Sequence, residues 1–333
     1  MKIVVDAFGG DFAPLEIVSG AVKALQENEK LNVVLVGDKD KITEILQSLV
    51  FLSDRLEIVH APDVVTMDDV PTVAIRTKKT SSIVVAYDYL KQNDDATALV
   101  SAGSTGATLT GAVLKLGRIK NISRPALAPI MPTLNDKSVM LLDCGANADC
   151  KAENLLHFGI MGSEYMKAMG VKKPRVALLN IGTEEEKGSE MIKEAHQLLK
   201  NSHLNFVGNI EARDVLRGNV DVVVSDGFSG NICLKTIEGT AEILFGELKD
   251  ITHSSFKAKM GALLLKKNLY GLKKKYDYKK VGGAPLLGVN KIVIKCHGNS
   301  KADSVACAIQ QAWKLSNNKL VEKVANAVEK NEE

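Results

Sequence analysis

The sequence lacks the features that mark several large classes of protein. Its formal net charge is only +3, from 43 basic and 40 acidic residues, so no excess of charge favours nucleic acid as a partner. It has no uninterrupted apolar run long enough to cross a bilayer. No signal-peptide pattern precedes the first apolar run, so we expect a cytoplasmic protein. The 5 cysteines form no C-x-x-C pair, which favours reduced thiols over a zinc site.

Motifs for common cofactors are absent as well. No G-x-G-x-x-G turn follows the first apolar run, and no G-x-x-x-x-G-K-[ST] occurs, which counts against the usual dinucleotide and P-loop folds. Asp143 and Asp226 offer carboxylates, but they belong to no tight acidic cluster. The sequence therefore predicts neither a cofactor nor a metal.

What the chain has instead is a repeated order of apolar run, glycine-containing loop and helix. In VDVVVSDGFSGN at residues 220–231, three valines predict a buried strand, and Gly227 and Gly230 permit a tight turn before a helix. That helix would direct unpaired N–H groups at a ligand in the loop, as phosphate sites do. Ligands bind outside the carboxyl ends of strands in open parallel sheets, so we expect such loops to share one crevice. Related segments lie at residues 2–14, 98–111, 140–147, 176–188 and 292–300.

Apolar periodicity predicts strands and helices in alternation along most of the chain. The alternation predicts an α/β fold with a doubly wound, mainly parallel sheet, in one large unit of one or two lobes over residues 1–315. Residues 316–333 predict a polar C-terminal helix that frays. The expected strands are 2–6, 31–36, 56–60, 97–101, 126–131, 138–143, 175–181, 204–208, 221–225 and 291–296. The expected helices are 14–27, 39–50, 81–92, 105–117, 151–169, 188–200, 231–249 and 300–315.

Residues 250–280 depart from this alternation. They combine many lysines and only two acidic residues with apolar positions at helical spacing, which predicts a basic amphipathic helical excursion. Such a segment suits an anionic membrane surface or an acidic protein. A helical hairpin packed on its own subunit or on a dimer mate fits equally well, because Lys267 interrupts the apolar face.

Nine segments, taken in order, resemble one family of bacterial enzymes. They are DAFGGDFAP (6–14), SAGSTGA (101–107), RPA (124–126), LDCGAN (142–147), LLNIGTEEEKG (178–188), FVGNIEARD (206–214), DVVVSDGFSGNICLKTIEG (221–239), GGAPLLGV (282–289) and HGNS (297–300). Over residues 2–312 the chain resembles the PlsX family, acyl-carrier-protein:phosphate acyltransferases that make fatty acyl phosphate for phospholipid synthesis. Phe8, Ala13 and Ser104 stand where that family usually has Met, Gly and Asn. The absence of Asn at position 104 weakens the expectation of phosphate binding there. The hydroxyl that Ser104 offers keeps that expectation from being lost.

The resemblance implies a fold similar to the isopropylmalate dehydrogenase and phosphate acetyltransferase group. It also implies a homodimer attached peripherally to the inner face of the cell membrane. The implied substrates are acyl carrier protein and inorganic phosphate, and a glycerol-phosphate acyltransferase that consumes the product is a possible partner. Phosphate itself attacks the thioester in this reaction, so positioning and preorganised charge supply most of the rate and no enzyme nucleophile is needed.

Lys187 is the first catalytic candidate, as the cation that holds phosphate and balances charge in the tetrahedral intermediate. It follows three glutamates, so a solvated charge run at a helix start is the alternative. We favour the catalytic role because the run leaves a predicted buried strand through Gly182, at the edge where ligands bind.

Asn231 is the second catalytic candidate. Its amide would orient phosphate or donate to the oxyanion, with Gly230 letting the backbone come close, and the alternative is an N-cap. Ser104 and Thr105 would contribute to an anion cradle or cap the next helix. The other candidates, which either line the site or organise its loops, are Asp6, Gly9, Gly103, Gly106, Asn147 and His297.

Acyl carrier protein is acidic, so the lysines of the 250–280 segment are candidates for docking it or a membrane. Attraction between opposite charges would speed the encounter. The docking candidates are Lys257, Lys259, Leu263, Leu264, Lys266 and Lys267. Candidates for an apolar groove that takes the acyl chain, or for core and dimer contacts, are Leu263, Leu264, Leu265, Leu286 and Leu287.

Three other functions stay open from the sequence. An NAD(P)-dependent decarboxylating dehydrogenase shares the expected fold group, and reduction of NAD or NADP would identify it. A phosphate acyltransferase that takes short acyl-CoA donors uses the same chemistry and differs in donor preference. A non-catalytic membrane-binding organiser would depend on residues 250–280 alone and would leave the glycine loops without a role.

Overall fold

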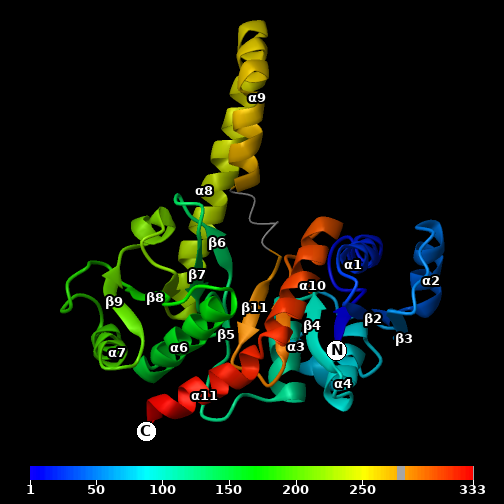
Figure 1. The fold of residues 1–333 in the computed structure, drawn as a ribbon, viewed down its shortest axis with the longest axis horizontal. Helices are drawn as coiled ribbons and strands as arrows, with labels where there is room; N and C mark the ends of the chain where they lie inside the picture. Colours follow the sequence, from blue (N-terminus) through cyan, green and yellow to red (C-terminus); the bar gives the residue numbers. More distant parts are fainter. Residues whose placement is uncertain (276–281, 333) are drawn as a thin grey trace.

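The computed structural model describes residues 1–275 and 282–332, and its architecture is α/β (Figure 1). The strands are β1 (Lys2–Asp6), β2 (Asn32–Gly37), β3 (Leu56–His60), β4 (Ala96–Ser101), β5 (Ala126–Leu127), β6 (Ile130–Pro132), β7 (Ser138–Leu142), β8 (Arg175–Leu179), β9 (Asn205–Ile210), β10 (Val222–Val224), β11 (Ala284–Leu287) and β12 (Ile292–Lys295). The helices are α1 (Leu15–Glu27), α2 (Lys39–Ser48), α3 (Pro71–Thr77), α4 (Ser82–Gln92), α5 (Thr105–Gly111), α6 (Ala152–Ala168), α7 (Glu190–Lys200), α8 (Gly227–His253), α9 (Phe256–Lys275), α10 (Ala302–Asn317) and α11 (Leu320–Glu332). A π-helical turn spans Ala112–Leu116, and a 3-10 helix spans Ala212–Arg217.

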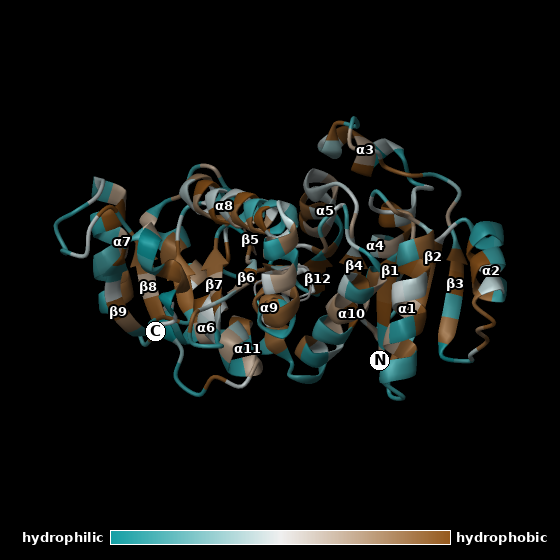
Figure 2. Cartoon of the chain, turned by 90° about the horizontal axis from the view of Figure 1, so that it is seen from above, coloured by the Kyte–Doolittle hydropathy of each residue, from teal (hydrophilic) through white to brown (hydrophobic). Residues whose placement is uncertain are grey.

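The strands form two sheets that lie side by side (Figure 2). The first has the order β3-β2-β1-β4-β12-β11-β5, and the second has the order β6-β7-β10-β8-β9. Most neighbours are parallel, while β11 runs antiparallel to β12 and β5, and β6 runs antiparallel to β7. The predicted doubly wound, mainly parallel α/β fold is confirmed, with its strands divided between two sheets.

The division occurs where the sequence predicts one strand at residues 126–131. The structure has two short strands there, β5 in the first sheet and β6 in the second. Pro129 lies between them and has no N–H to donate to a ladder, so one continuous strand is disfavoured. Its carbonyl instead accepts a hydrogen bond from the Leu141 N–H of β7 at 3.1 Å. The chain therefore passes from one lobe to the other at this proline.

Besides the 3-10 helix, strand β11 and helix α3 escape the sequence prediction, because both are short and contain residues typical of turns. Strand β11 comes from a segment with Gly282, Gly283 and Pro285, which indicates a loop rather than a strand. Helix α3 has only 7 residues and begins at Pro71, too short for apolar periodicity to identify.

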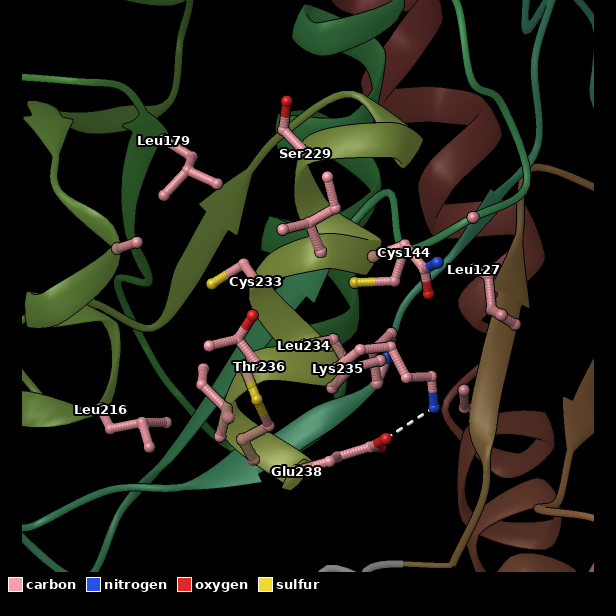
Figure 3. Close-up of a pocket in the computed structure, with 18 of the residues that line it drawn as sticks. Leu127, Cys144, Leu179, Leu216, Ser229, Cys233, Leu234, Lys235, Thr236 and Glu238 are labelled. Atoms are coloured by element: carbon pink, nitrogen blue, oxygen red, sulfur yellow. Dashed lines mark hydrogen bonds and ion pairs between the residues drawn. The ribbon is translucent and has the colours of Figure 1, made fainter. Parts of the chain in front are cut away.

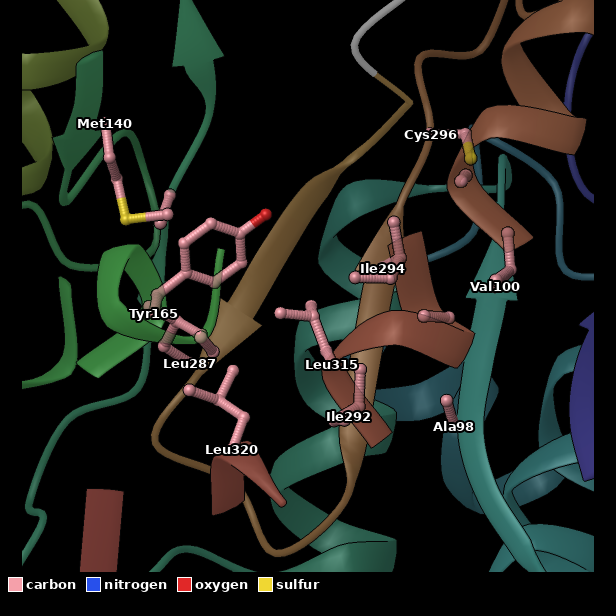
Figure 4. Packing of buried hydrophobic residues seen from close by; sticks show 14 of the residues in the cluster. Ala98, Val100, Met140, Tyr165, Leu287, Ile292, Ile294, Cys296, Leu315 and Leu320 are labelled. Atoms are coloured by element: carbon pink, nitrogen blue, oxygen red, sulfur yellow. The ribbon is translucent and has the colours of Figure 1, made fainter. Parts of the chain in front are cut away.

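Alternate residues of each strand face opposite layers of helices. In β1, Ile3 and Val5 join the core beneath α1 and α10, while Val4 joins the core beneath α4. The first of these cores continues beneath the second sheet, where it includes α6, α7 and α11 (Figure 4). The Tyr165 hydroxyl of α6 accepts a hydrogen bond from Gln311 of α10 at 2.8 Å, which ties the lobes together. The two lobes therefore share one continuous core on one side of the sheets.

The last helix, α11, packs against the body of the protein along one face, and the fraying of its end stays a prediction. Leu320, Val324 and Val328 of α11 are buried, and α11 packs against α6. These residues recur at four-residue spacing, so they form one apolar stripe on an otherwise polar helix.

Helices α8 and α9 form a hairpin that rises away from the rest of the molecule (Figure 1). The predicted helical excursion is confirmed for residues 250–275, while 276–280 lie outside the described residues. Phe256, Leu263 and Leu264 are strongly exposed on α9. No helix in the described ranges is long and apolar enough to cross a membrane.

An ion pair fastens two strands of the second sheet to each other. The Arg175 guanidinium of β8 donates to both oxygens of Asp221 at 2.9 Å and to the carbonyl of Gly218 at 3.1 Å. The Asp221 side chain is nearly buried. Burial by itself would raise the pKa of Asp221, but the hydrogen bonds from Arg175 outweigh it and hold that pKa below its usual value.

We expect Arg175→Met to lower the free energy of unfolding by about 3 kcal/mol at pH 7, because it leaves a buried carboxylate without its partner. A carboxyl with a lowered folded pKa stabilises above its unfolded pKa, and that contribution disappears as pH falls through the folded value. The difference between variant and wild type should therefore shrink in acid. Urea unfolding at pH 7 and in acid measures this difference in the free energy of unfolding. The control is Arg217→Met, which replaces an exposed arginine paired with Asp214. Equal losses in the two variants would contradict the role of the pair.

Candidate active site

The loops that follow β1 and β4 meet at the carboxyl edge of the first sheet. Asp6 is buried and accepts a hydrogen bond from the Ser101 hydroxyl at 2.7 Å. A Cβ added to Gly9 would lie 2.5 Å from the Asp6 carboxylate and 2.6 Å from the Gly103 nitrogen. Burial raises the pKa of Asp6. Asp6 therefore organises these loops, and Gly9 permits their close approach.

The loop after β4 leads into α5. The Ser104 hydroxyl accepts a hydrogen bond from the Ala107 N–H at 3.4 Å, as the capping alternative expects. A Cβ on Gly106 would lie 2.6 Å from Pro71, so α3 packs closely on this turn. Thr105 is exposed and lines a large cavity that has lining residues from both lobes.

The matching loop of the second lobe is built around Asp143. Its carboxylate accepts hydrogen bonds from the Leu127 N–H at 2.9 Å and the Asn147 N–H at 2.7 Å. The Asn147 amide donates to Asp143 at 2.9 Å and to the Pro125 carbonyl at 2.7 Å. Asn147 is buried and does not line the cavity, so the structure gives it contacts that organise the loop.

Helix α8 begins directly against this loop. A Cβ on Gly230 would collide with the Asp143 carbonyl, and one on Gly227 would lie 2.6 Å from the Asp143 carboxylate. Asp226 caps the helix by accepting from the Ser229 N–H at 2.8 Å. The N-cap alternative for Asn231 is therefore wrong, because the helix starts four residues earlier than the sequence predicts.

Asn231 lies in the second turn of α8, exposed and lining the cavity. Its amide makes no hydrogen bond within residues 1–275 and 282–332, so both its donors and its oxygen can meet a ligand. A Cβ on Gly145 would lie 3.7 Å from that amide, which places the loop after β7 beside it. Burial raises the pKa of the nearby Cys233 thiol, which disfavours a reactive thiolate.

A cavity of 1430 Å³ is lined by α8 and by residues of both lobes on either side of it (Figure 3). Part of its polar lining comes from the carboxyl ends of strands in both sheets and from the start of α8. The polar residues at these strand ends and at the start of α8 include Thr105, Asn180, Ser229, Asn231, Lys295 and His297. Further polar lining residues are Arg213 and, on α8, Lys235, Thr236, Glu238 and Thr240. Most of the remaining lining is aliphatic. The cavity can therefore hold an anion at the strand ends and an apolar group elsewhere.

Lys295 is a candidate that the sequence prediction missed. It ends β12, is buried, and directs its ammonium at the carbonyl of Cys296. It has no carboxylate within salt-bridge distance among the described residues, and burial lowers its pKa. A lysine that ends an apolar strand, IVIK, just before the HGNS motif was the available signal. A buried ammonium without a paired carboxylate is suited to an anionic ligand.

Lys187 lies outside the cavity lining, beside two residues that belong to it, Gly188 and Ser189. Its side chain is exposed, and its carbonyl accepts from the Asn180 amide at 3.0 Å. Gly182 is buried. Glu185, from the preceding charge run, pairs with Lys200 at 2.7 Å. The structure thus places Thr105, Asn231 and His297 in the lining of one cavity and leaves Lys187 just outside that lining.

The docking candidates all lie on α9 and are exposed, and none lines the cavity. Leu286 and Leu287 are buried in the core, and Leu263, Leu264 and Leu265 are exposed on α9. The five leucines expected to form an apolar groove therefore do not line the cavity. No group of three or more metal-ligating side chains occurs in the parts of the chain that the structure describes.

Known proteins resemble this chain over nearly its full length. The model of a family described as "Fatty acid synthesis protein" matches residues 1–323. A phosphate acyltransferase of Clostridium novyi (strain NT) is 48% identical over 99% of both chains, and one of Geobacillus sp. (strain WCH70) is 45% identical over 99% of both.

Solved structures show the same fold at low sequence identity. A phosphotransacetylase from Streptococcus pyogenes has a TM-score of 0.64 at 20% identity and covers 95% of this chain and 94% of its own. A putative 4-hydroxythreonine-4-phosphate dehydrogenase from Salmonella typhimurium has a TM-score of 0.54 at 14% identity, covering 95% and 99%. The predicted fold group is confirmed. The chain belongs to the fatty acid synthesis protein family, the PlsX family that its motifs resemble.

Proposed function

We propose that this protein is an acyltransferase that converts fatty acyl-acyl carrier protein and inorganic phosphate to acyl phosphate and free acyl carrier protein. The observation that carries the proposal is its near full-length similarity to proteins named phosphate acyltransferase. The cavity supports it, because anion-binding groups at the strand ends adjoin a long aliphatic surface. The dehydrogenase alternative has only a shared fold in its favour.

In this reaction a phosphate oxygen attacks the thioester carbon, the C–O bond forms, and the C–S bond breaks to release the carrier thiolate. The enzyme must hold phosphate beside the carbonyl and stabilise the oxyanion. Asn231, in the second turn of α8 and with an amide that makes no hydrogen bond among the described residues, would donate to phosphate or to the oxyanion. Lys295 supplies a cation at the end of β12, and Lys187 supplies one from the loop after β8. Burial raises the pKa of the Cys233 thiol, which disfavours a thiolate nucleophile, and the reaction needs none because phosphate itself attacks.

The function is tested by phosphate-dependent release of free thiol from palmitoyl-acyl carrier protein, with palmitoyl-CoA in parallel. We expect release from the carrier protein and little from the CoA donor. Asn231→Ala should lower kcat/KM by about 100-fold, the usual effect of losing one oxyanion donor. Equal use of palmitoyl-CoA would favour a general phosphate acyltransferase, and reduction of NAD or NADP with hydroxy acids would favour the dehydrogenase.

Two lysine variants separate the roles of the cations. Lys295→Met keeps the volume of the side chain and removes a buried charge, so stability should stay equal or rise. The KM for phosphate should rise by about tenfold or more, a loss of about 1.4 kcal/mol in phosphate binding. Lys187→Ala, on an exposed side chain, should leave thermal unfolding unchanged and lower turnover. An unchanged phosphate KM in Lys295→Met would remove that residue from the site, and near-normal turnover in Lys187→Ala would remove Lys187.

We further propose that the α8–α9 hairpin carries the contacts outside the active site. Lys257, Lys259, Lys266 and Lys267 give α9 exposed positive charge, which suits acidic acyl carrier protein and an anionic membrane surface. The exposed apolar residues of the same helix fit a homodimer interface or the membrane. On this proposal the protein works in the cytoplasm at the inner face of the cell membrane, where it would pass acyl phosphate to a glycerol-phosphate acyltransferase.

Charge reversal tests the docking surface. In the double variant Lys266→Glu/Lys267→Glu, the KM for acyl carrier protein should rise at low salt, and its dependence on salt should become shallower, because fewer charges attract the carrier. The matched control is Lys30→Glu/Lys91→Glu, which makes the same charge change at two exposed lysines of the first lobe. An identical salt response in the two variants would count against docking on α9.

A further inference from the structure

Helix α8 carries an apolar stripe that no other element fully covers. Its members recur at three- and four-residue spacing, which on an ordinary amphipathic helix marks the buried face. They are Leu234, Ile237, Ala241, Phe245 and Leu248. All five line the cavity and are only partly buried, whereas the buried residues of α8 are Gly227, Gly230 and Cys233, near its start. Beyond its first two turns, α8 therefore faces open space with aliphatic side chains.

The walls opposite this stripe are also apolar. Leu179 and Leu216 come from the second lobe and lie on one side of α8, while Leu127 lies on the other (Figure 3). Ile192 of α7 and Met131 of β6 extend these walls. A surface of this kind gains free energy when it is removed from water, at about 25 cal/mol per Å² of apolar area. The cavity is therefore suited to a long aliphatic ligand, far larger than phosphate.

The two sides of α8 differ in polarity. Lys235 and Glu238 line the cavity and form an ion pair at 2.6 Å, which Figure 3 shows on the side of Leu127. An aliphatic chain on that side would displace water from the pair at a cost in free energy. On the side of Leu179 and Leu216, α8 presents Cys233 and Thr236 (Figure 3). The lining residue Arg213 comes from the same segment as Leu216, but its side chain is 73% exposed and pairs with Glu211, which lies outside the lining. This side offers the more favourable path for an apolar chain.

The stripe is long enough to cover a fatty acyl chain. From Asn231 to Leu248 the helix advances by about 25 Å, at about 1.5 Å per residue. A chain of membrane-lipid length spans about 15 Å, half of a hydrocarbon core about 30 Å thick. The reacting end of the cavity lies at Asn231, so a chain attached there would reach about as far as Ala241. Ala241, about 15 Å along the axis from Asn231, has the smallest side chain of the stripe.

We propose that the acyl chain of the substrate lies along α8 from Asn231 toward Leu248, on the side of Leu179 and Leu216, and that Ala241 sets the longest chain admitted. The proposal rests on the proposed function, since it assigns the acyl subsite of that reaction. It places the chain beside the base of the hairpin rather than on the leucines of α9. A second copy of this chain is the competing occupant, because Ile243 and Leu244 of α8 are exposed next to the stripe.

The experiment introduces tryptophan into the stripe and compares donors of different length. Ala241→Trp should lower kcat/KM for palmitoyl-acyl carrier protein relative to hexanoyl-acyl carrier protein by about tenfold or more, because a bulky group at that depth meets only the longer chain. Glu242→Trp is the matched control, on the same helix but exposed and outside the cavity lining, and should leave the ratio unchanged. Thr240→Trp, also in the lining, replaces Ala241→Trp if that variant fails to fold.

Each result decides the proposal. A fall in the palmitoyl to hexanoyl ratio at Ala241→Trp alone supports it. Equal loss for both donors, or no change, overturns it, and so does a change of oligomeric state without a change of ratio, which would assign the stripe to a second copy.

Inactivity of the wild-type protein with every donor would refute the proposed function but leave the subsite testable. Binding of cis-parinaric acid, a fluorescent fatty acid, then tests whether an aliphatic chain lies along α8. Weaker binding in Ala241→Trp than in Glu242→Trp supports the proposed path of the acyl chain along α8, and equal binding overturns it.

Discussion

The contact on which the site depends is the close approach of the first turn of α8 to the loop after β7. Gly227 and Gly230 have no side chains, and any Cβ there would collide with Asp143 or its surroundings. The Asp143 carboxylate accepts N–H groups from its own loop and from Leu127, so it holds together the segment on which α8 rests. The backbone of α8 can then lie directly over the strand ends. Asn231 reaches the cavity because the turn before it fits so tightly.

The same contact leaves the rest of α8 without close packing. A helix anchored by glycines at one end leaves the sheet as it extends, and here it continues into the hairpin with α9 (Figure 1). On the opposite face of the second sheet, α6 and α7 bury their apolar residues in the core shared by both lobes. The core beneath α8 is smaller, and Leu234 and Ile237 only border it. One face of the sheet therefore provides stability and the other provides space for a ligand.

Local patterns predicted much of this architecture because strands and glycine loops are short-range features. The valines of β10, the turn at Gly227 and Gly230, and the carboxyl-edge loops were all identifiable. The division into two sheets was not, because it depends on which strands pair across long stretches of chain. The start of α8 was misplaced because the glycines suggested a loop where tertiary contact demands a helix. The apolar groove was expected from other leucines, and the cavity's aliphatic lining on α8 was not identified, since a stripe such as Leu234 and Ile237 looks the same whether it faces a core or a cavity.

Lys295 shows why the cation of such a site is hard to recognise from sequence and costly to keep. A strand that ends in lysine usually projects it into water, yet here the surrounding loops bury it. Burial lowers the pKa of Lys295, because it disfavours the charged ammonium. The negative charges of Asp6 and Asp11 offset only part of that cost. A bound anion would offset more of it and would stabilise the folded state in proportion to its concentration. On the proposed function, the charge that burial disfavours is therefore the charge that would bind phosphate.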